Sequence, residues 1–166
     1  LRSAGRFEQS GLNGFAIHQQ QSFVYHSSKL EQVDVSKTDA RELRNVDQRE
    51  LSDSELEAKG LSESYSWMLE NVGLIDDSYL AFSDQVHRLL TAEWLATAGK
   101  YRTQPRGASG GITYAHPSEI KTLMTQLGDD YKQLGDDYKK GTISLINFLA
   151  ENHAKFETIH PYDDGN

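Results

Sequence analysis

The sequence predicts an all-α domain, a bundle of helices with one small β-hairpin. Apolar residues recur every three to four positions over long stretches, which is the spacing that favours amphipathic helices. The three prolines, at positions 105, 117 and 161, leave these stretches uninterrupted. Between Tyr101 and His116, several glycines precede Ile112, Thr113 and Tyr114, and this composition is typical of a loop with a hairpin.

An N-terminal segment, residues 1–60, is expected to precede the helical core. Residues 1–26 combine glycine, glutamine and aromatic residues without a clear period, which indicates an irregular segment lying along the domain. Serine caps predict a short helix over residues 27–33 and another that starts at residues 36–39 and continues through Val46. The stretch up to Gly60 is highly charged, so we expect it to be exposed.

The core, residues 61–166, is expected to contain four helices. The first covers residues 61–74, with Gly73 as its stop signal. The second begins at Asp76 or Asp77 and ends near Gly99, and the third begins at Pro117, because proline suits the first turn of a helix. The fourth covers residues 142–160, and its apolar spacing predicts these buried residues: Ile143, Ile146, Leu149, Ala150, His153 and Phe156.

Residues 126–139 consist of one heptad, Gln-Leu-Gly-Asp-Asp-Tyr-Lys, repeated without change. Two copies are too few for a solenoid, which needs about three or more units to bury a core. The adjacent aspartates do not have the spacing of a calcium-binding loop. We interpret the repeat as a local duplication in an exposed helix end or loop.

Composition excludes several classes of protein. The chain has 166 residues, about one average domain, of which 37% are apolar, and its net charge of −8 disfavours non-specific binding to nucleic acid. With no cysteine, disulfides, thiolate zinc sites, iron–sulfur clusters and cysteine nucleophiles are excluded. No apolar stretch is long enough to cross a membrane, so we expect a soluble, cytoplasmic protein. The chain starts without methionine and stops at Asn166, and we expect it to be a fragment.

The last seven residues, His-Pro-Tyr-Asp-Asp-Gly-Asn, carry the most chemistry. His160 can accept a proton near neutral pH, and Asp164 can hold Mg²⁺ while substrate phosphates and water complete the coordination. Gly165 permits close approach of backbone N–H groups to an anion, and Asn166 can donate from its amide. These residues fit a phosphate-handling site, but proline, aspartate, glycine and asparagine also form ordinary solvated turns. The residue types alone leave both interpretations open.

This segment resembles the signature of the Fic (Fic/Doc) family, His-Pro-Phe-x-Asp/Glu-Gly-Asn-Gly-Arg. Tyr162 replaces the usual phenylalanine, and the chain ends before the final Gly-Arg. Residues 98–102 resemble the family's Ala-Gly-x-Tyr-Arg, and residues 110–117 with the apolar positions that follow resemble its flap hairpin and next helix. The resemblance covers about residues 20–166 in family order. We therefore expect a Fic core, truncated at the catalytic motif, in residues 61–166.

The resemblance implies transfer of AMP from ATP, with Mg²⁺, to a hydroxyl side chain of a target protein. His160 would be the base that takes the hydroxyl proton, and Asp164 would hold the metal ion. Gly165 and Asn166, with Asp164, would bind the nucleotide phosphates. The expected partners are ATP and a target protein, with no nucleic acid or membrane, and a homodimer is possible.

The resemblance also implies a role for the hairpin. Gly111, Ile112, Thr113 and Tyr114 would form the flap that binds the target backbone by strand addition. Tyr162 is expected to pack inward as the family's phenylalanine does, and its hydroxyl then needs a hydrogen-bond partner.

Some members of the family carry an inhibitory helix with the pattern Ser/Thr-x-x-x-Glu-Gly/Asn. Ser27 and Glu31 fit it with Gln32 in the last position, whereas Ser66 and Glu70 fit it more literally. We prefer Glu31, because it lies far upstream of His160, as an N-terminal inhibitory helix requires.

Two alternatives to adenylyl transfer stay open. The same fold can remove AMP or transfer another phosphate-containing group, or it can be a catalytically silent nucleotide- or protein-binding module. We expect the other histidines, including His87 and His153, to be packing or surface residues rather than metal ligands.

Overall fold

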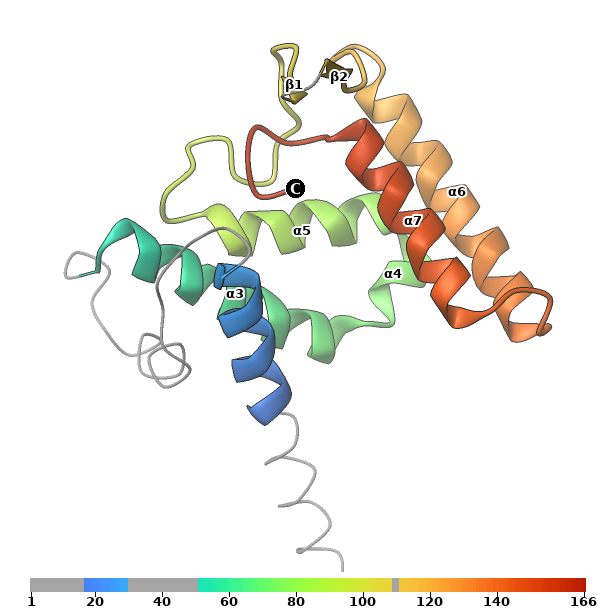
Figure 1. Cartoon of the computed structure of the whole chain (residues 1–166), viewed down its shortest axis with the longest axis horizontal. Helices are drawn as coiled ribbons and strands as arrows, with labels where there is room; N and C mark the ends of the chain where they lie inside the picture. Colours follow the sequence, from blue (N-terminus) through green and yellow to red (C-terminus); the bar gives the residue numbers. More distant parts are fainter. Residues whose placement is uncertain (1–16, 30–50, 109–110) are drawn as a thin grey trace, which may run out of the picture. The chain divides into compact units, whose positions relative to one another are not determined.

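The computed structural model of the chain describes residues 17–29, 51–108 and 111–166. These residues are mostly helical, which confirms the predicted class, and they include one pair of two-residue strands. Residues 17–29 form a helix. The labelled elements (Figure 1) are α3 (Asp53–Asn71), α4 (Leu74–Asp77), α5 (Tyr79–Thr91), β1 (Gly107–Ala108), β2 (Ile112–Thr113), α6 (Ile120–Lys139) and α7 (Leu145–Ile159).

The chain divides into two compact units. One contains the described residues up to Glu70 together with Leu89–Trp94, and the other contains Asn71–Arg88 with Leu95–Asn166. The predicted boundary after residue 60 falls inside α3, which continues to Asn71.

In the first unit, the helix at residues 17–29 packs against α3. Val24 and Ala58 are fully buried between them, and the rings of Phe23 and Tyr65 stack with their centroids 5.0 Å apart. Gln20 donates from its amide to the backbone oxygen of Ser62 at 2.8 Å. The prediction of an irregular segment is therefore wrong for residues 17–26. Apolar contact with α3, rather than a regular apolar period, stabilises this helix.

α3 begins eight residues before the predicted start at Leu61. Ser52 donates from both its backbone N–H and its hydroxyl to the carboxylate of Glu55, at 2.8 and 2.6 Å, as in a capping box. This cap begins the helix at Asp53 instead of Leu61. Within α3, Gly60 allows the close approach of the Leu90 backbone, because a Cβ at position 60 would clash with the backbone oxygen of Leu90. The predicted helices beyond residue 29 and before residue 51, and Glu31 with them, lie outside the described residues.

Between α3 and β1 the predicted second helix proved shorter. Its cap is Ser78, whose hydroxyl accepts the N–H of Ala81 at 3.2 Å, because the predicted caps Asp76 and Asp77 belong to α4. α5 ends at Thr91 instead of near Gly99. Backbone bonds such as Ala98 N–H to Leu95 O, at 3.1 Å, close tight turns there instead.

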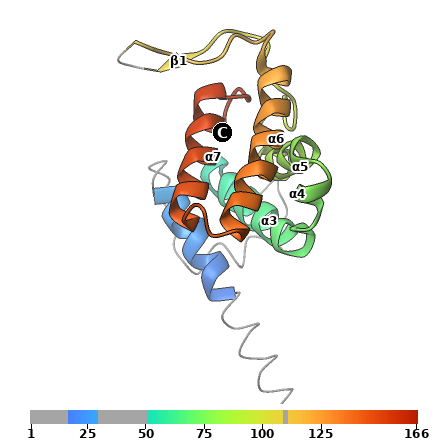
Figure 2. The same ribbon diagram turned by 90° about the vertical axis from the view of Figure 1, so that its right-hand side faces the viewer.

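The second unit is built on α6 and α7, which lie side by side (Figures 1 and 2). Ile120, Met124 and Leu127 of α6 and Ile159 of α7 form its buried apolar cluster. Residues 126–139, the repeated heptad, form the C-terminal part of α6 and end at its last residue, Lys139. This confirms the predicted helix end, although Leu127 and Gly128 of the first copy are buried. A seven-residue step is almost two helical turns, so both copies present the same residue types to the same side.

The repeat contributes to the packing of α7. Tyr131 and Tyr138, the equivalent tyrosines of the two copies, both contact Phe148, with ring centroids 5.3 and 6.2 Å away. Lys155 of α7 also reaches Asp130 at 2.7 Å. These contacts decide which side of α7 faces α6.

The predicted buried face of α7 is consequently wrong in part. The helix begins at Leu145, after Ser144 accepts the Asn147 N–H, and it buries Phe148, Asn152 and Ile159. Ile146 is 77% exposed and Leu149 is 56% exposed, although their spacing placed them in the expected core. Apolar residues occupy more than one face of this helix, so their spacing alone does not show which face is buried.

None of the helices in the described ranges is both long and apolar enough to cross a membrane.

The two glycines of the repeat supply a stability test. A Cβ at Gly128 would lie 3.1 Å from the Cβ of Tyr79, whereas nothing lies within 4 Å of a Cβ at Gly135. Gly135→Ala should raise the free energy of unfolding by about 0.5–1 kcal/mol, because alanine favours helix. Gly128→Ala should lower it by roughly 1–2 kcal/mol through overpacking. Denaturant unfolding of both variants measures this, and equal gains would contradict the packing described here.

Candidate functional site

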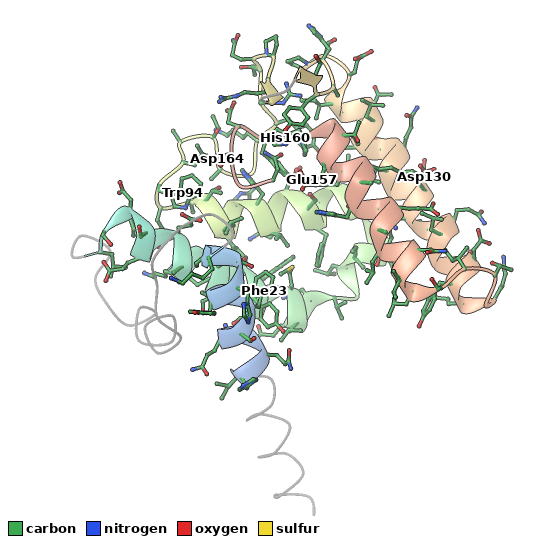
Figure 3. All side chains as sticks on the ribbon, in the orientation of Figure 1. Phe23, Trp94, Asp130, Glu157, His160 and Asp164 are labelled. Carbon is green, nitrogen blue, oxygen red and sulfur yellow. The ribbon has the colours of Figure 1, made fainter. Side chains whose placement is uncertain are left out.

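The candidate site begins where α7 ends. His160 is the C-cap residue, with φ 48° and ψ 66°, and its N–H donates to Phe156 O at 2.8 Å. Among the described residues it is the one non-glycine residue with positive φ. Figure 3 shows His160 at the end of α7 and Asp164 on the loop that follows. This left-handed turn, at a cost of about 1–2 kcal/mol, directs the chain into the loop.

The loop closes on itself through Asn166. The side-chain oxygen of Asn166 accepts the Tyr162 N–H at 2.8 Å, and its Nδ2 donates to Tyr162 O at 3.1 Å. The same Nδ2 lies 3.2 Å from Nε2 of His160. Because an amide nitrogen can only donate, Nε2 must be the accepting, unprotonated nitrogen of the imidazole.

The surroundings of the His160 ring favour its neutral form. Its ring stacks on that of Tyr114, with centroids 4.0 Å apart and planes 8° from parallel. Burial lowers the pKa of His160, which Arg102 and Arg106 lower further and Glu157 and Asp164 partly restore. A neutral imidazole with an accepting Nε2 can take a proton from a hydroxyl at neutral pH.

The two adjacent aspartates have different surroundings. Asp163 accepts from the hydroxyl of Thr97 at 3.1 Å and lies 3.4 Å from the guanidinium of Arg106. Asp164 is exposed, and its Oδ1 accepts the Gly165 N–H at 2.8 Å. Gly165 has φ 66°, a conformation that glycine adopts without strain. The loop thus presents one carboxylate to solvent and holds the other.

Asp164 fits a magnesium ion that is bound mainly by its substrate. In the described part of the chain, no group of three or more His, Cys, Asp or Glu side chains could hold a metal ion. Mg²⁺ commonly uses one or two carboxylates, with phosphates and waters as its other ligands. A single exposed carboxylate beside a positive-φ glycine meets that requirement.

Tyr162 packs inward, as predicted. It is almost completely buried, and its hydroxyl donates to Asp84 Oδ1 at 2.9 Å. Ser83 Oγ lies 2.9 Å from the hydroxyl oxygen of Tyr162. Burial raises the pKa of Tyr162 and also that of Asp84. Because both polar groups are removed from water, the hydrogen bond between them replaces contacts that water would otherwise make. Two residues of α5 therefore provide the partners that the tyrosine requires and a phenylalanine would not.

His87 has a larger role than sequence reasoning gave it. It is buried, its Nδ1 accepts the Gly99 N–H at 2.8 Å, and its Nε2 donates to Asp164 O at 2.9 Å. Its ring lies 3.7 Å from that of Tyr162 and 6° from parallel. His87 thus connects α5, the Gly99 turn and the loop. Its sequence neighbours give no signal for this, because its partners lie 12 and 77 positions away.

The predicted flap and Ser27, the described member of the predicted inhibitory pair, lie in different units. β1 and β2 pair antiparallel, Gly107 with Thr113 and Ala108 with Ile112, and Gly111 has φ 83°. Tyr114 lies against His160, whereas Ser27 lies in the helix of residues 17–29, in the other unit. Glu31 is outside the described residues, and its alternative, Glu70, is exposed near the end of α3. The His153 side chain is 76% exposed, so its predicted burial in the last helix is wrong and it is a surface residue.

The buried His87 should make stability depend on pH. Burial lowers the pKa of His87 from 6.5, so the folded protein binds fewer protons than the unfolded chain as the pH falls below 6.5. The free energy of unfolding should therefore decrease from pH 6.5 downward. His87→Ala should lower it by roughly 2–4 kcal/mol at pH 7 and flatten this decrease. Urea unfolding at several pH values tests this, with the exposed His153→Ala as the control; an unchanged slope in His87→Ala would contradict it.

Comparisons with known proteins agree with this geometry. A profile of the Fic/DOC family matches residues 80–166, which is more than half of the chain. No curated protein matches the chain significantly.

A solved structure shares the fold. It is the crystal structure of a Fic domain containing signaling protein from Bacteroides thetaiotaomicron, with a TM-score of 0.64 and 21% sequence identity. The similarity covers 93% of this chain and 60% of that one, so this chain spans about three fifths of the length of the protein it matches. At this identity the likeness shows the fold alone. Because the family profile covers the helices and the loop that form the site, the chain belongs to the Fic/DOC family, whose domains generally transfer AMP or other phosphate-containing groups.

Proposed function

We propose that this protein is an adenylyltransferase, which transfers AMP from ATP, bound with Mg²⁺, to a Ser, Thr or Tyr hydroxyl of a target protein. The observation that carries the proposal is the loop from His160 to Asn166. It brings an accepting imidazole nitrogen and an exposed carboxylate together at the end of one helix. Membership of the family supports phosphate-group chemistry at this loop.

The reaction needs one proton transfer and one substitution at phosphorus. His160 Nε2 takes the proton of the target hydroxyl, and the oxygen forms a bond to the α-phosphorus of ATP. The bond from that phosphorus to the bridging oxygen of the β-phosphate breaks, and pyrophosphate leaves. The target side chain then carries AMP through a phosphodiester. Since Asn166 Nδ2 lies 3.2 Å from Nε2, the hydroxyl must replace this amide as the donor to His160.

The other loop residues bind the nucleotide. Asp164 would hold Mg²⁺, which neutralises charge on the phosphates when it is bound. Gly165, with positive φ, lets its part of the backbone approach a phosphate oxygen, and Asn166 can offer an amide donor to the same anion. Asp163 stays engaged with Thr97 and Arg106, so we assign it no metal role.

The β1–β2 pair is proposed as the flap. A target segment that adds alongside residues 111–114 would be bound through main-chain hydrogen bonds, which are independent of side-chain sequence. Because Tyr114 is stacked on His160, a target segment bound alongside these residues would lie beside the base. The expected cytoplasmic location and the possible homodimer stay predictions, as does autoinhibition by Glu31.

Mass spectrometry of the full-length protein incubated with Mg²⁺ and ATP tests the proposed reaction. The protein, as self-modified material or with a target, should gain the mass of AMP, and His160→Ala should abolish the gain because no other group accepts the proton. His153→Ala, on the same helix but exposed, should keep it.

Three outcomes would contradict this proposal. A product of different mass would indicate transfer of another phosphate-containing group, and an adduct that persists in His160→Ala would exclude His160 as the base. No adduct in any form, with ATP still bound, would favour a silent binding module.

The inhibitory glutamate can be identified by paired variants. Glu31→Gly should raise AMP incorporation by roughly tenfold or more, because an inhibitory carboxylate excludes productive ATP binding. Glu70→Gly should leave the rate unchanged. Initial rates of incorporation from labelled ATP measure both, and a rise confined to Glu70→Gly would make Glu70 the inhibitor.

A further inference from the structure

Arg102 is a buried residue to which the proposed reaction assigns no role. Its side chain is 2% exposed, and it is the largest of the fully buried side chains in the described part of the protein. A buried guanidinium is costly unless its donors are satisfied. Here they are satisfied by main-chain carbonyl oxygens, from three separate segments of the chain.

Arg102 holds three consecutive carbonyl groups around the predicted base. Nε donates to His160 O at 2.7 Å, and Nη2 donates to Ile159 O at 3.3 Å. The Arg102 backbone N–H donates to Pro161 O at 2.9 Å. One residue therefore fixes the peptide groups before and after the His160 Cα.

These carbonyls have few other donors available. The last carbonyl groups of a helix lack intrahelical partners, and they form the negative end of the helix dipole. His160 leaves the helix with φ 48°, and Pro161, which follows, has no N–H to donate. A guanidinium supplies both the missing donors and the positive charge that this end of α7 favours.

The same guanidinium reaches the segment that leaves β2. Nη2 also donates to Ala115 O at 2.5 Å, while the Ala115 N–H donates to Thr158 O at 3.3 Å. The side chain of Tyr114, the residue before Ala115, stacks on the His160 ring. The Ala115 N–H is thus bonded to the last turn of α7, and the Ala115 carbonyl oxygen is bonded to Arg102. Figure 1 shows β2 at this end of the α6–α7 pair.

We propose that Arg102 is a positioning residue that holds His160 in its left-handed conformation and joins the end of α7 to the segment after β2. It keeps the base and the target-binding strand in one fixed geometry. The inference rests on the proposed function for its catalytic consequence, but its structural part does not. Lysine cannot replace arginine here, because one ammonium group cannot span the same fork of carbonyls.

The test compares Arg102→Lys with Lys100→Gln, an exposed charge in the same loop. The stacked Tyr114 ring should shift the NMR signals of the His160 ring protons upfield in the free protein, and Tyr114→Leu should give the unshifted reference. Arg102→Lys should move these signals toward that reference, and Lys100→Gln should leave them in place. No nucleotide is needed, so this readout stands even if AMP transfer is never observed.

The kinetic readout separates positioning from simple destabilisation. Arg102→Lys should lower kcat for AMP transfer about 100-fold, since misplacing a base by about 1 Å has that effect, while KM for ATP changes less than about threefold. Unchanged ring signals in Arg102→Lys would overturn the proposal, whatever happens to kcat. Equal losses in kcat and in ATP affinity would overturn it too, because they would indicate general disruption.

If Arg102→Lys does not fold, the proposal can be tested by NMR on the unaltered protein. The Arg102 Nε–H proton should exchange with solvent at least about 100-fold more slowly than that of Arg106, whose side chain is 51% exposed. A through-bond NMR coupling from Arg102 Nε to the His160 carbonyl carbon should also be present. Fast exchange and no coupling would overturn the proposal.

Discussion

The C-terminal turn of α7 is the feature on which the rest of the site depends. The helix ends in a strained residue, His160, followed by a proline, so its last carbonyl groups need donors from elsewhere. Arg102 supplies them, and the loop that follows closes through Asn166. This arrangement holds the His160 imidazole at the end of α7, while the loop beyond it exposes the carboxylate of Asp164 to solvent. Without the cap, neither the position of the base nor that of Asp164 would be defined.

Surroundings, and not residue type, distinguish the groups that can react from those that cannot. His87 has both ring nitrogens bonded to the backbone, so it can neither accept nor donate a proton without breaking a contact. His160 has an Nε2 that meets only a side-chain amide, which a substrate hydroxyl can displace. The adjacent aspartates differ in the same way, since Asp163 is engaged and Asp164 is exposed. In each pair, one residue is therefore held by contacts within the protein, and the other is available for the proposed reaction.

The sequence predicted the helical class and placed His160 at the end of the last helix, because local spacing and capping carry that information. It did not predict the buried side of α7, because its apolar residues occupy several faces and the tyrosines of α6 select one of them. The Ser52–Glu55 cap was visible in the sequence but was missed. The burial of Arg102 could not be predicted, since it depends on carbonyl groups 13 and 58 positions away that only folding brings together.

The most direct test of this account is the protonation state of the His160 imidazole, measured by nitrogen NMR in the free protein across pH 5–8. The account predicts a neutral ring at pH 7 with its proton on Nδ1, and a pKa below the ordinary 6.5, because burial disfavours the charged form. A ring that is protonated at pH 7, or one that carries its proton on Nε2, would contradict the account. In either state His160 could not accept a proton at the nitrogen that faces the loop.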